Sequence, residues 1–322
     1  MVRIGLYGNN GHQLPTDGGD RSWTDRGAVV AVAGFAAKDA AAARHYDTLD
    51  GMLADPDIDL VSLCSPRRAD QAADAIRCME AGKHVLAEKP CAFNEGDLDR
   101  IIQTAGRTGR VFHEMAPTIV EEPYATIAAV VREGRIGSVV QVYAQKSYPW
   151  TTSRPRDEAV DGGLLRQAGV YLYRFVEHIA GIRVVETAAY ESRVGSHDST
   201  SQCRRAASVI MRLENGGVAS GVANYCTPAP PDWSRWGYET LRVFGEHGLV
   251  ESINYGQVLR IVITEGGVSD IVPAAIPDPA RSADQFLLHV LREIEGDEKP
   301  LMSIDAELHP TRMVNRAKAA AQ

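Results

Sequence analysis

The chain has 322 residues, of which 44% are hydrophobic and 24% charged, as in ordinary soluble globular proteins. This length exceeds what one hydrophobic core normally serves, so we expect two domains. The formal charge of −8, without any block of Lys or Arg, argues against nucleic acid or a membrane as partner. The first residues enter an apolar strand without a signal-peptide pattern, which predicts a cytoplasmic protein.

The cysteines are scattered and odd in number, and no pair forms a Cys-x-x-Cys motif. They are Cys64, Cys78, Cys91, Cys203 and Cys226. This pattern predicts free thiols in a reducing compartment and gives no sign of a structural zinc site. No metal site is predicted.

Strands and helices alternate over residues 1–118. Strands are expected at 2–7, 28–33, 59–64, 84–88 and 110–113, and helices at 36–46, 47–54, 67–81 and 95–105. Asp47 and Asn94 are expected to cap two of these helices, and Gly82 to end a third in a left-handed conformation. This alternation predicts an α/β domain built on a doubly wound parallel sheet.

The pattern changes over residues 119–322. After a helix at 122–133, strands are expected at 138–148, 184–193, 206–213, 218–225, 239–244, 250–255 and 258–264. Asn215-Gly216 and Glu265-Gly266 supply hairpin turns, and two helices follow at 282–295 and 304–320. We therefore predict an α+β domain with a large, open, mainly antiparallel sheet, whose free face can meet a partner.

One helix, 164–180, interrupts these strands. Its apolar residues fall on one stripe, and Gln167, Tyr171, Arg174 and His178 recur at three- and four-residue spacing on the other face. Such a polar face is either the wall of a cleft or plain surface. The loop 226–236, rich in Pro and Trp, either stacks on sugar rings or packs beneath itself.

Several motifs occur in an order that resembles one enzyme family. They are the glycine turn after the first strand, Ala54-Asp55-Pro56-Asp57-Ile58-Asp59, Ser65-Pro66, Ala81-Gly82-Lys83-His84-Val85, Glu88-Lys89-Pro90, Gly134-Arg135-Ile136-Gly137, Gly162-Gly163 with Gly169, and Phe244-Gly245-Glu246-His247-Gly248. The chain resembles the glucose-fructose oxidoreductase, inositol dehydrogenase and rhizopine-catabolism (Gfo/Idh/MocA) family, with divergence. The resemblance implies a Rossmann-like dinucleotide-binding domain, an open-sheet substrate domain, and a homodimer or homotetramer joined through the sheets.

The resemblance also implies NAD or NADP as cofactor, held by Gly8, Asn10, Gly11, Ser65, Pro66, Glu88 and Lys89. The turn departs from the usual glycine pattern, because Asn10 and Gln13 stand where glycines are expected and no helical periodicity follows. The second strand ends at Gly34-Phe35 without an acid for a ribose diol. Lys38 or Arg44 either meets a 2′-phosphate or lies on a solvated helix surface.

In the family, the counterpart of Lys89 hydrogen-bonds the reacting oxygen, and an Asp and a His lie on the interrupting helix. Here Gln167 and Tyr171 replace that pair, so Lys89, Tyr171 and Gln167 are the catalytic candidates. Tyr171 could donate a proton if Lys89 lowered its pKa, and a structural tyrosine is the alternative. For Lys89 the alternative is a pairing with Glu88 that closes the strand end.

The substrate-binding candidates are Lys89, Tyr148, Arg166 and Arg174, with His113 and Glu114 as further candidates for the wall of the cleft. The loop after Ser65-Pro66 contains Arg67, Arg68 and Asp70, and further arginines stand at Arg154 and Arg156. The arginines suggest the hypothesis of a substrate that carries a carboxylate or phosphate. Scattered surface arginines are the alternative interpretation.

Three functions remain open from the sequence. The favoured one is an NAD(P)-dependent oxidoreductase acting on a hydroxyl or carbonyl of a sugar, polyol or related small molecule. The second is a ligand-binding or regulatory protein on the same scaffold without hydride transfer. The third is a lyase or isomerase that uses the same cleft for proton transfer.

Overall fold

The computed structural model describes residues 1–15, 21–34, 43–151, 154–195, 203–227, 237–253, 258–264, 269–273 and 279–321. The chain forms two compact units. The first comprises Met1–Ala116, Ala159–Gly162 and Ala283–His309, and the second comprises Pro117–Glu158, Gly163–Ser282 and Pro310–Gln322. The chain thus crosses from the first unit to the second near the predicted boundary at 118, and returns to the first unit after the second sheet. Within the described ranges, no helix is long and apolar enough to cross a bilayer.

The first unit contains a six-stranded parallel sheet in the order β3-β2-β1-β4-β5-β6. Its strands are β1 (Val2–Tyr7), β2 (Gly27–Ala33), β3 (Arg44–Tyr46), β4 (Leu60–Leu63), β5 (His84–Ala87) and β6 (Phe112–Glu114). The strand order reverses between β1 and β4. This is the topological switch point, beside which doubly wound sheets bind their ligands.

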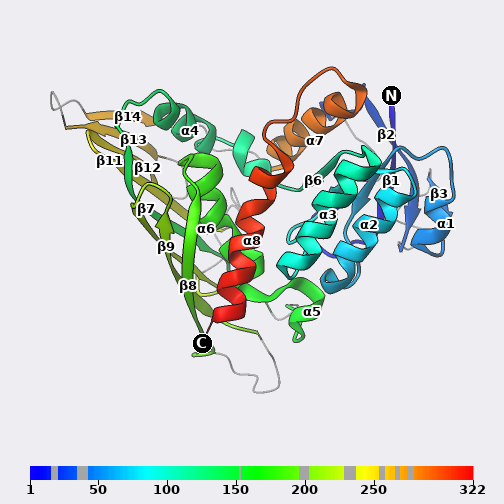
Figure 1. The fold of residues 1–322 in the computed structure, drawn as a ribbon, viewed down its shortest axis with the longest axis horizontal. Coiled ribbons are helices and arrows are strands. Elements are labelled where there is room, and N and C mark those ends of the chain that lie inside the picture. The colour runs from blue at the N-terminus through cyan, green and yellow to red at the C-terminus, as the bar shows by residue number, and fades with distance from the viewer. Residues whose placement is uncertain are drawn as a thin grey trace. The chain divides into compact units, whose positions relative to one another are not determined.

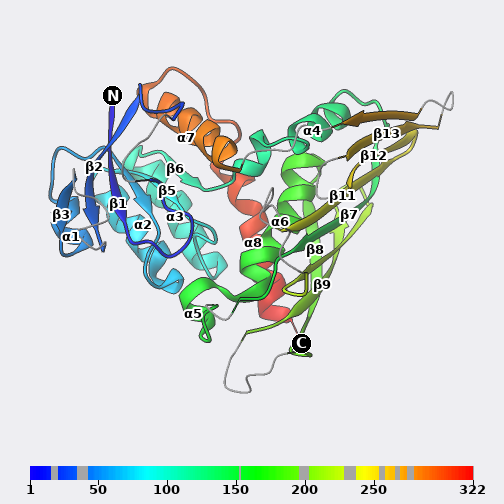
Figure 2. The same cartoon turned by 180° about the vertical axis from the view of Figure 1, so that it is seen from behind.

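Three helices connect the later strands: α1 (Leu49–Leu53), α2 (Gln71–Glu80) and α3 (Glu95–Thr108). Helices α2 and α3 lie side by side against one face of the sheet (Figures 1 and 2). The Asn94 side chain accepts a hydrogen bond from Asp97 N at 2.9 Å, and Gly82 is left-handed with φ of 80°, both as predicted.

Helix α7 (Pro279–Glu295) packs against β1 and β2. A Cβ placed on Gly27 would lie 2.9 Å from Leu291 Cδ1 and 3.1 Å from Ile4 Cδ1. The indole Nε1 of the buried Trp23 donates to Asp284 Oδ1 at 3.2 Å. A helix from the C-terminal part of the chain therefore supplies apolar cover for the first two strands.

Two local predictions in this unit were wrong. Arg44–Tyr46 forms strand β3 beside β2 instead of ending a helix, because pairing with a neighbouring strand outweighs local helix propensity. The rest of that predicted helix, including Lys38, lies outside the described residues. Helix α1 is capped by Thr48, whose Oγ1 accepts from Gly51 N at 3.1 Å, and not by Asp47.

The second unit contains an eight-stranded sheet in the order β14-β13-β12-β11-β7-β10-β9-β8. Its strands are β7 (Val139–Ser147), β8 (Val184–Ser192), β9 (Ala206–Leu213), β10 (Val218–Asn224), β11 (Tyr238–Gly245), β12 (Gly248–Ile253), β13 (Val258–Ile263) and β14 (Ser269–Pro273). All neighbours are antiparallel except β7 and β10, so the mainly antiparallel sheet is confirmed. Strand β14 was not predicted, and the Glu265-Gly266 turn and Trp233 and Trp236 lie outside the described residues.

Helices α4 (Tyr124–Arg132), α6 (Val170–Arg174) and the C-terminal part of α8 (Ile304–Ala320) contribute to the core of this unit. In Figure 2, α6 lies against the sheet beside β7 and β8. Wider π-helical turns, Leu165–Gly169 and Phe175–Ile179, flank α6, and the predicted apolar stripe of 164–180 is buried. Arg174, predicted on the polar face, is also fully buried, since wide turns shift the 3.6-residue period.

Candidate functional site

The turn after β1 is closely packed against the carboxyl edge of the parallel sheet. Gly8 and Gly11 have φ of 67° and 117°, values that glycine adopts without strain. A Cβ on Gly8 would lie 2.2 Å from the carbonyl oxygen of Cys64, and one on Gly11 would lie 2.7 Å from Glu88 Cγ. Both positions therefore require glycine for a close approach of the turn to the ends of β4 and β5.

Two amide side chains fasten this turn where the usual pattern has glycines. Gln13 Nε2 donates to Gly8 O at 2.9 Å and to Ser62 O at 3.2 Å. Asn10 Nδ2 donates to Pro66 O at 3.2 Å and to Val160 O at 2.5 Å. The amides thus hold the turn by hydrogen bonds to carbonyl groups, a role that the sequence reasoning did not assign to them.

The buried Arg68 and Gln71 extend this network to Glu88. Arg68 Nη1 donates to Gln71 Oε1 at 3.1 Å, and its other terminal nitrogen donates to Asn10 O. Gln71 Nε2 donates to the carbonyl oxygens of Glu88 and Pro90. Arg68 therefore holds the turn in place, and its burial corrects its interpretation as a surface arginine.

Two polar atoms at this edge are buried without a hydrogen-bond partner among the described residues: Glu88 Oε2 and Arg68 Nε. Leaving such atoms unpaired is costly, so a ligand that supplies polar groups here is favoured. Lys89, which directly follows Glu88, is 6% exposed. With the switch point and the close glycine turn, these residues fit the binding of a nucleotide cofactor.

The structure gives less support for binding of the pyrophosphate group of such a cofactor. Between β1 and β2, the described residues 8–15 and 21–26 form turns and extended segments and no helix, so the N-terminal dipole that usually holds a pyrophosphate is missing from them. Arg44, for which a contact with a 2′-phosphate was one of two interpretations, forms ion pairs with Asp55 at 3.1 Å and Asp57 at 3.4 Å. Its guanidinium is thus already neutralised by carboxylates.

His113 is a structural residue in this unit and not the predicted wall of a substrate cleft. Its Nδ1 contacts Glu307 Oε2 at 2.8 Å and its Nε2 contacts Glu293 Oε2 at 2.9 Å. Burial lowers the pKa of this imidazole, but the two carboxylates outweigh burial and raise it to about 10. Glu114 accepts a hydrogen bond from Cys91 N at 2.7 Å, so it also serves the local structure.

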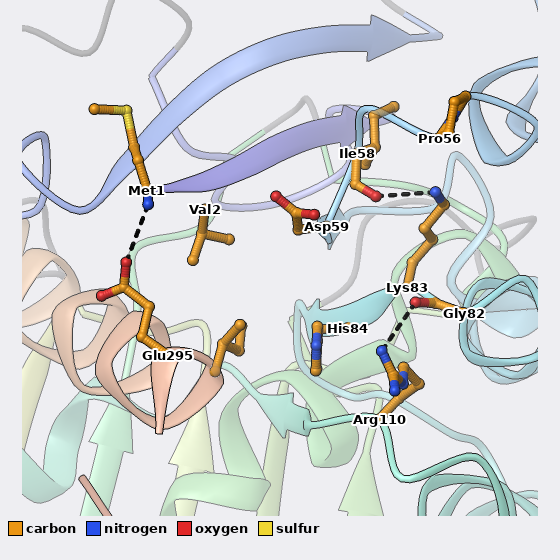
Figure 3. Close-up of a pocket in the computed structure, with 11 residues that line it drawn as sticks. Met1, Val2, Pro56, Ile58, Asp59, Gly82, Lys83, His84, Arg110 and Glu295 are labelled. Carbon is orange, nitrogen blue, oxygen red and sulfur yellow. Dashed lines mark hydrogen bonds and ion pairs between the residues drawn. The ribbon is translucent and has the colours of Figure 1, made fainter. Parts of the chain in front are cut away.

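A cavity of about 300 Å³ lies at the opposite, amino-terminal edge of the sheet (Figure 3). Lys83 Nζ donates to the carbonyl oxygens of Asp55 and Ile58, and His84 Nδ1 accepts from Val111 N at 2.9 Å. Burial lowers the pKa of His84 to about 4, so its ring is neutral. The cavity contains none of the predicted site residues and lies away from the edge where parallel sheets bind ligands.

In the second unit, Tyr171 lies beside a buried lysine that the sequence reasoning missed. Lys146 Nζ, on β7, is 4.4 Å from the centroid of the Tyr171 ring and 5.0 Å from that of Tyr148. Lys146 forms an ion pair with Glu239. The hydroxyl of Tyr124 donates to the same carboxylate. The sequence did not indicate a role for Lys146, because this residue lies within a strand and belongs to no recognisable motif.

Two arginines of the second unit lie over aromatic rings. The guanidinium carbon of Arg154 is 3.6 Å from the Tyr225 ring centroid, and that of Arg205 is 4.3 Å from the Trp150 ring centroid. The Nε atoms of both arginines are buried without a hydrogen-bond partner among the described residues. Of these four residues, only Arg154 was a candidate from the sequence.

The other site residues that the sequence predicted in the second unit lie in different surroundings. Arg166 Nε donates to Asn315 Oδ1 at 2.8 Å, and burial lowers the pKa of its guanidinium. The Arg174 guanidinium carbon is 5.6 Å from the Tyr171 ring centroid, so Arg174 belongs to the Tyr171 cluster. A Cβ on Gly169 would lie 3.7 Å from Val314 Cγ2, so this glycine allows close packing against α8. Gln167 lies one turn before Tyr171.

Comparison with known proteins establishes the class of this protein. Residues 26–115 match the family described as "Oxidoreductase family, NAD-binding Rossmann fold", and residues 124–251 match the "GFO/IDH/MocA C-terminal domain". The chain therefore belongs to the Gfo/Idh/MocA oxidoreductase family, whose first domain is an NAD-binding Rossmann fold. The first match begins after β1 and the glycine turn.

Individual relatives agree with this class. An uncharacterized oxidoreductase of Rhizobium meliloti is 32% identical over 187 residues, 56% of this chain and 53% of that protein, so the chain spans about half the length of that relative. A dTDP-3,4-didehydro-2,6-dideoxy-alpha-D-glucose 3-reductase of Streptomyces violaceoruber is 28% identical over 87% of this chain and 81% of its own. The structure of a variant 3-ketoreductase from Actinomadura kijaniata, in complex with TDP-benzene and NADP, has a TM-score of 0.76 at 17% identity and covers 100% of this chain and 98% of its own.

Proposed function

We propose that this protein is an NAD(P)-dependent oxidoreductase that acts on a hydroxyl or carbonyl group of a sugar, polyol or related small molecule. The observation that carries the proposal is the carboxyl edge of the first unit. There the buried Lys89 follows Glu88, and Glu88 Oε2 and Arg68 Nε lack partners among the described residues. When bound, the nicotinamide supplies or accepts the hydride.

The proposal assigns Lys89 to the reacting oxygen, where an ammonium group stabilises developing alkoxide charge. Tyr171 is the proton donor or acceptor, and Gln167 precedes it by one helical turn on the same helix. The cofactor would be held by Gly8, Asn10, Gly11, Ser65, Pro66, Glu88 and Lys89. The substrate would be held by Lys89, Tyr148, Arg166 and Arg174.

The relatives support a sugar-like substrate, because the Streptomyces violaceoruber protein is named as a reductase of a dTDP-sugar. The cations beside Tyr148 and Tyr225 support an anionic group on that substrate, such as a phosphate or carboxylate. Comparing turnover of a neutral sugar, a sugar phosphate and a sugar nucleotide tests this point. Equal kcat/KM values for the neutral and anionic compounds would contradict it.

Calorimetric titration with NAD(H) and NADP(H) tests the proposed function directly. We expect micromolar binding of at least one cofactor, and an absorbance change at the nicotinamide band with a panel of sugars and polyols. Binding weaker than millimolar for all four forms would refute the proposal. The Lys89→Met variant should lose turnover while keeping part of the cofactor affinity, because the other six residues assigned to the cofactor remain.

One observation favours a second candidate, a ligand-binding protein on this scaffold without hydride transfer. The described residues between β1 and β2 lack the helix that usually supports a pyrophosphate. Thermal stabilisation by a sugar or polyol, without any cofactor binding or turnover, would support this candidate. A lyase or isomerase would appear in the same screen as product formation without a change at the nicotinamide band.

We also infer that the protein forms a homodimer or homotetramer through the open sheet. We expect this oligomer in the cytoplasm. The relevant observation is that Tyr190, Ile210 and Val218 are 65%, 64% and 47% exposed on β8, β9 and β10. Strand register places Ile210 opposite Ala188 and Ser220, so three neighbouring strands present Ile210 and two small side chains on one face, where a partner can cover the exposed Ile210. Sedimentation analysis of Ile210→Asp should show dissociation; an unchanged mass, or a monomeric wild type, would contradict this inference.

A further inference from the structure

We infer that Lys146 is the positioning residue for Tyr171, and that Tyr148 donates the hydrogen bond that stabilises the Tyr171 phenolate when its proton leaves. This inference rests on the proposed function, in which Tyr171 exchanges a proton with the substrate oxygen. It replaces the expectation that Lys89 makes Tyr171 more acidic. All the residues that carry it belong to the second unit.

The location of Lys146 supports this assignment. The side chain of Lys146 is 3% exposed and comes from the middle of the sheet, where β7 lies between β11 and β10. Its ammonium nitrogen is 4.4 Å from the Tyr171 ring centroid and 5.0 Å from the Tyr148 ring centroid. A buried cation so close to both rings interacts with them more strongly than it would in water.

Glu239 fixes the ammonium group in this place. One oxygen of Glu239 pairs with Lys146, and the other accepts the hydroxyl of the fully buried Tyr124. Because Glu239 is 5% exposed and shared between two partners, the lysine is held between the sheet and the helix that carries Tyr171. The ion pair therefore orients the cation, in addition to balancing its charge.

Tyr148 supplies the second half of the arrangement. Burial and then the neighbouring Tyr171, with which Tyr148 forms a hydrogen bond, raise the pKa of Tyr148 well above the ordinary value. Tyr148 therefore keeps its proton and can donate it in a hydrogen bond to the oxygen of a Tyr171 phenolate.

The proton balance is simple. In the reductive direction, the O–H bond of Tyr171 breaks and an O–H bond forms on the substrate alkoxide, leaving a phenolate. The Lys146 ammonium group and the Tyr148 hydroxyl stabilise that phenolate until solvent returns a proton. In the oxidative direction the same groups favour the phenolate that accepts the substrate proton.

A purely structural role for Lys146 makes a different prediction, so the two can be separated. We would label the tyrosines with ¹³C at Cζ, assign Tyr171 with Tyr171→Phe, and titrate it by NMR in the wild type and in Lys146→Met. We expect Lys146→Met to raise the titration midpoint of Tyr171 by at least about one pH unit, a tenfold change in its ionisation constant. Lys146→Arg should restore most of the shift, and Tyr148→Phe should also raise the midpoint.

Lys318→Met is the matched control, because Lys318 is another poorly exposed lysine of this unit, paired with Glu158 and Glu191. It should leave the Tyr171 midpoint unchanged. An unchanged midpoint in both Lys146→Met and Tyr148→Phe, or an equal shift in Lys318→Met, would overturn the inference. The titration needs no cofactor, so a negative result for Lys146 is distinguishable from a failure of nicotinamide binding. If the protein turns over a substrate, the pH profile of kcat should shift together with the Tyr171 midpoint.

Discussion

The two units carry their candidate residues in contrasting ways. At the carboxyl edge of the first unit, Gln13, Asn10 and Gln71 donate to backbone carbonyls, and the glycine turn lies against Glu88. In the second unit, Lys146 and Arg154 lie over aromatic rings. The first arrangement is fixed by directional hydrogen bonds along neighbouring strand ends, whereas the second depends on side chains from distant segments. The contrast shows that hydrogen bonds to the backbone hold the candidate residues of the first unit, and that contacts between cations and rings hold those of the second.

The largest expected effect is on the chemistry assigned to the first unit. Lys89→Met should lower kcat/KM by about 10²- to 10⁴-fold, because it removes the cation that stabilises charge on the reacting oxygen. Cofactor affinity, measured by calorimetry, should fall by a smaller factor, because the other residues assigned to the cofactor remain. Lys83→Met is the control, since Lys83 bonds only backbone carbonyls among its described partners and faces the opposite edge. Equal losses in both variants would remove Lys89 from the site.

The next effect concerns stability in the first unit. His113→Gln should lower the free energy of unfolding by about 3 kcal/mol, because it breaks a buried pairing with Glu293 and Glu307. The matched variant His289→Gln, at a partly exposed pairing with Glu298, should lower the free energy of unfolding much less, because solvent screens an exposed ion pair. Urea unfolding of both variants measures the difference.

His113 also predicts the pH dependence of stability. The pKa of His113 is raised to about 10 in the folded state, above its ordinary value, so its contribution is complete below about pH 6.5. That contribution should be lost as the pH rises through 10. The wild type should therefore lose stability between these pH values relative to His113→Gln. Parallel pH curves for the two proteins would contradict this account.

A smaller effect is expected at the amide that fastens the turn. Gln13→Leu leaves the carbonyl groups of Gly8 and Ser62 without their side-chain donor, which should cost about 2 kcal/mol. The exposed Asn9 offers a control, and Asn9→Ala should be nearly neutral. If Gln13→Leu also weakens cofactor binding, as the close turn implies, calorimetry will show a higher Kd.

The smallest effect on stability is expected in the second unit. Arg154→Met removes one cation–π contact with Tyr225 and should lower the free energy of unfolding by about 1 kcal/mol or less. Its effect on KM for an anionic substrate should be larger than its effect for a neutral one. A strong loss of stability without such a KM difference would show that the cations of this unit are structural.

The order of elements was predictable because local patterns record it. Alternating strands and helices, the Asn94 cap and the left-handed Gly82 were all found where the sequence indicated. Strand β3 and the cap at Thr48 were mispredicted, because neighbouring-strand pairing and side-chain geometry decide such details. The return of α7 to the first unit was also invisible, since nothing local marks which sheet a helix covers.

By itself, the sequence determined the family, the two sheets and the candidates Lys89 and Tyr171, since motifs and periodicity are properties of contiguous residues. Only the tertiary structure decided that Arg68 and Gln71 brace the glycine turn, and that His113 is held by two glutamates from the C-terminal part of the chain. It also placed Lys146 of a strand, and Tyr148 directly after that strand, near Tyr171 of a helix. The physical reason is that burial, charge pairing and ring contacts arise between residues far apart in the chain, which local patterns do not record.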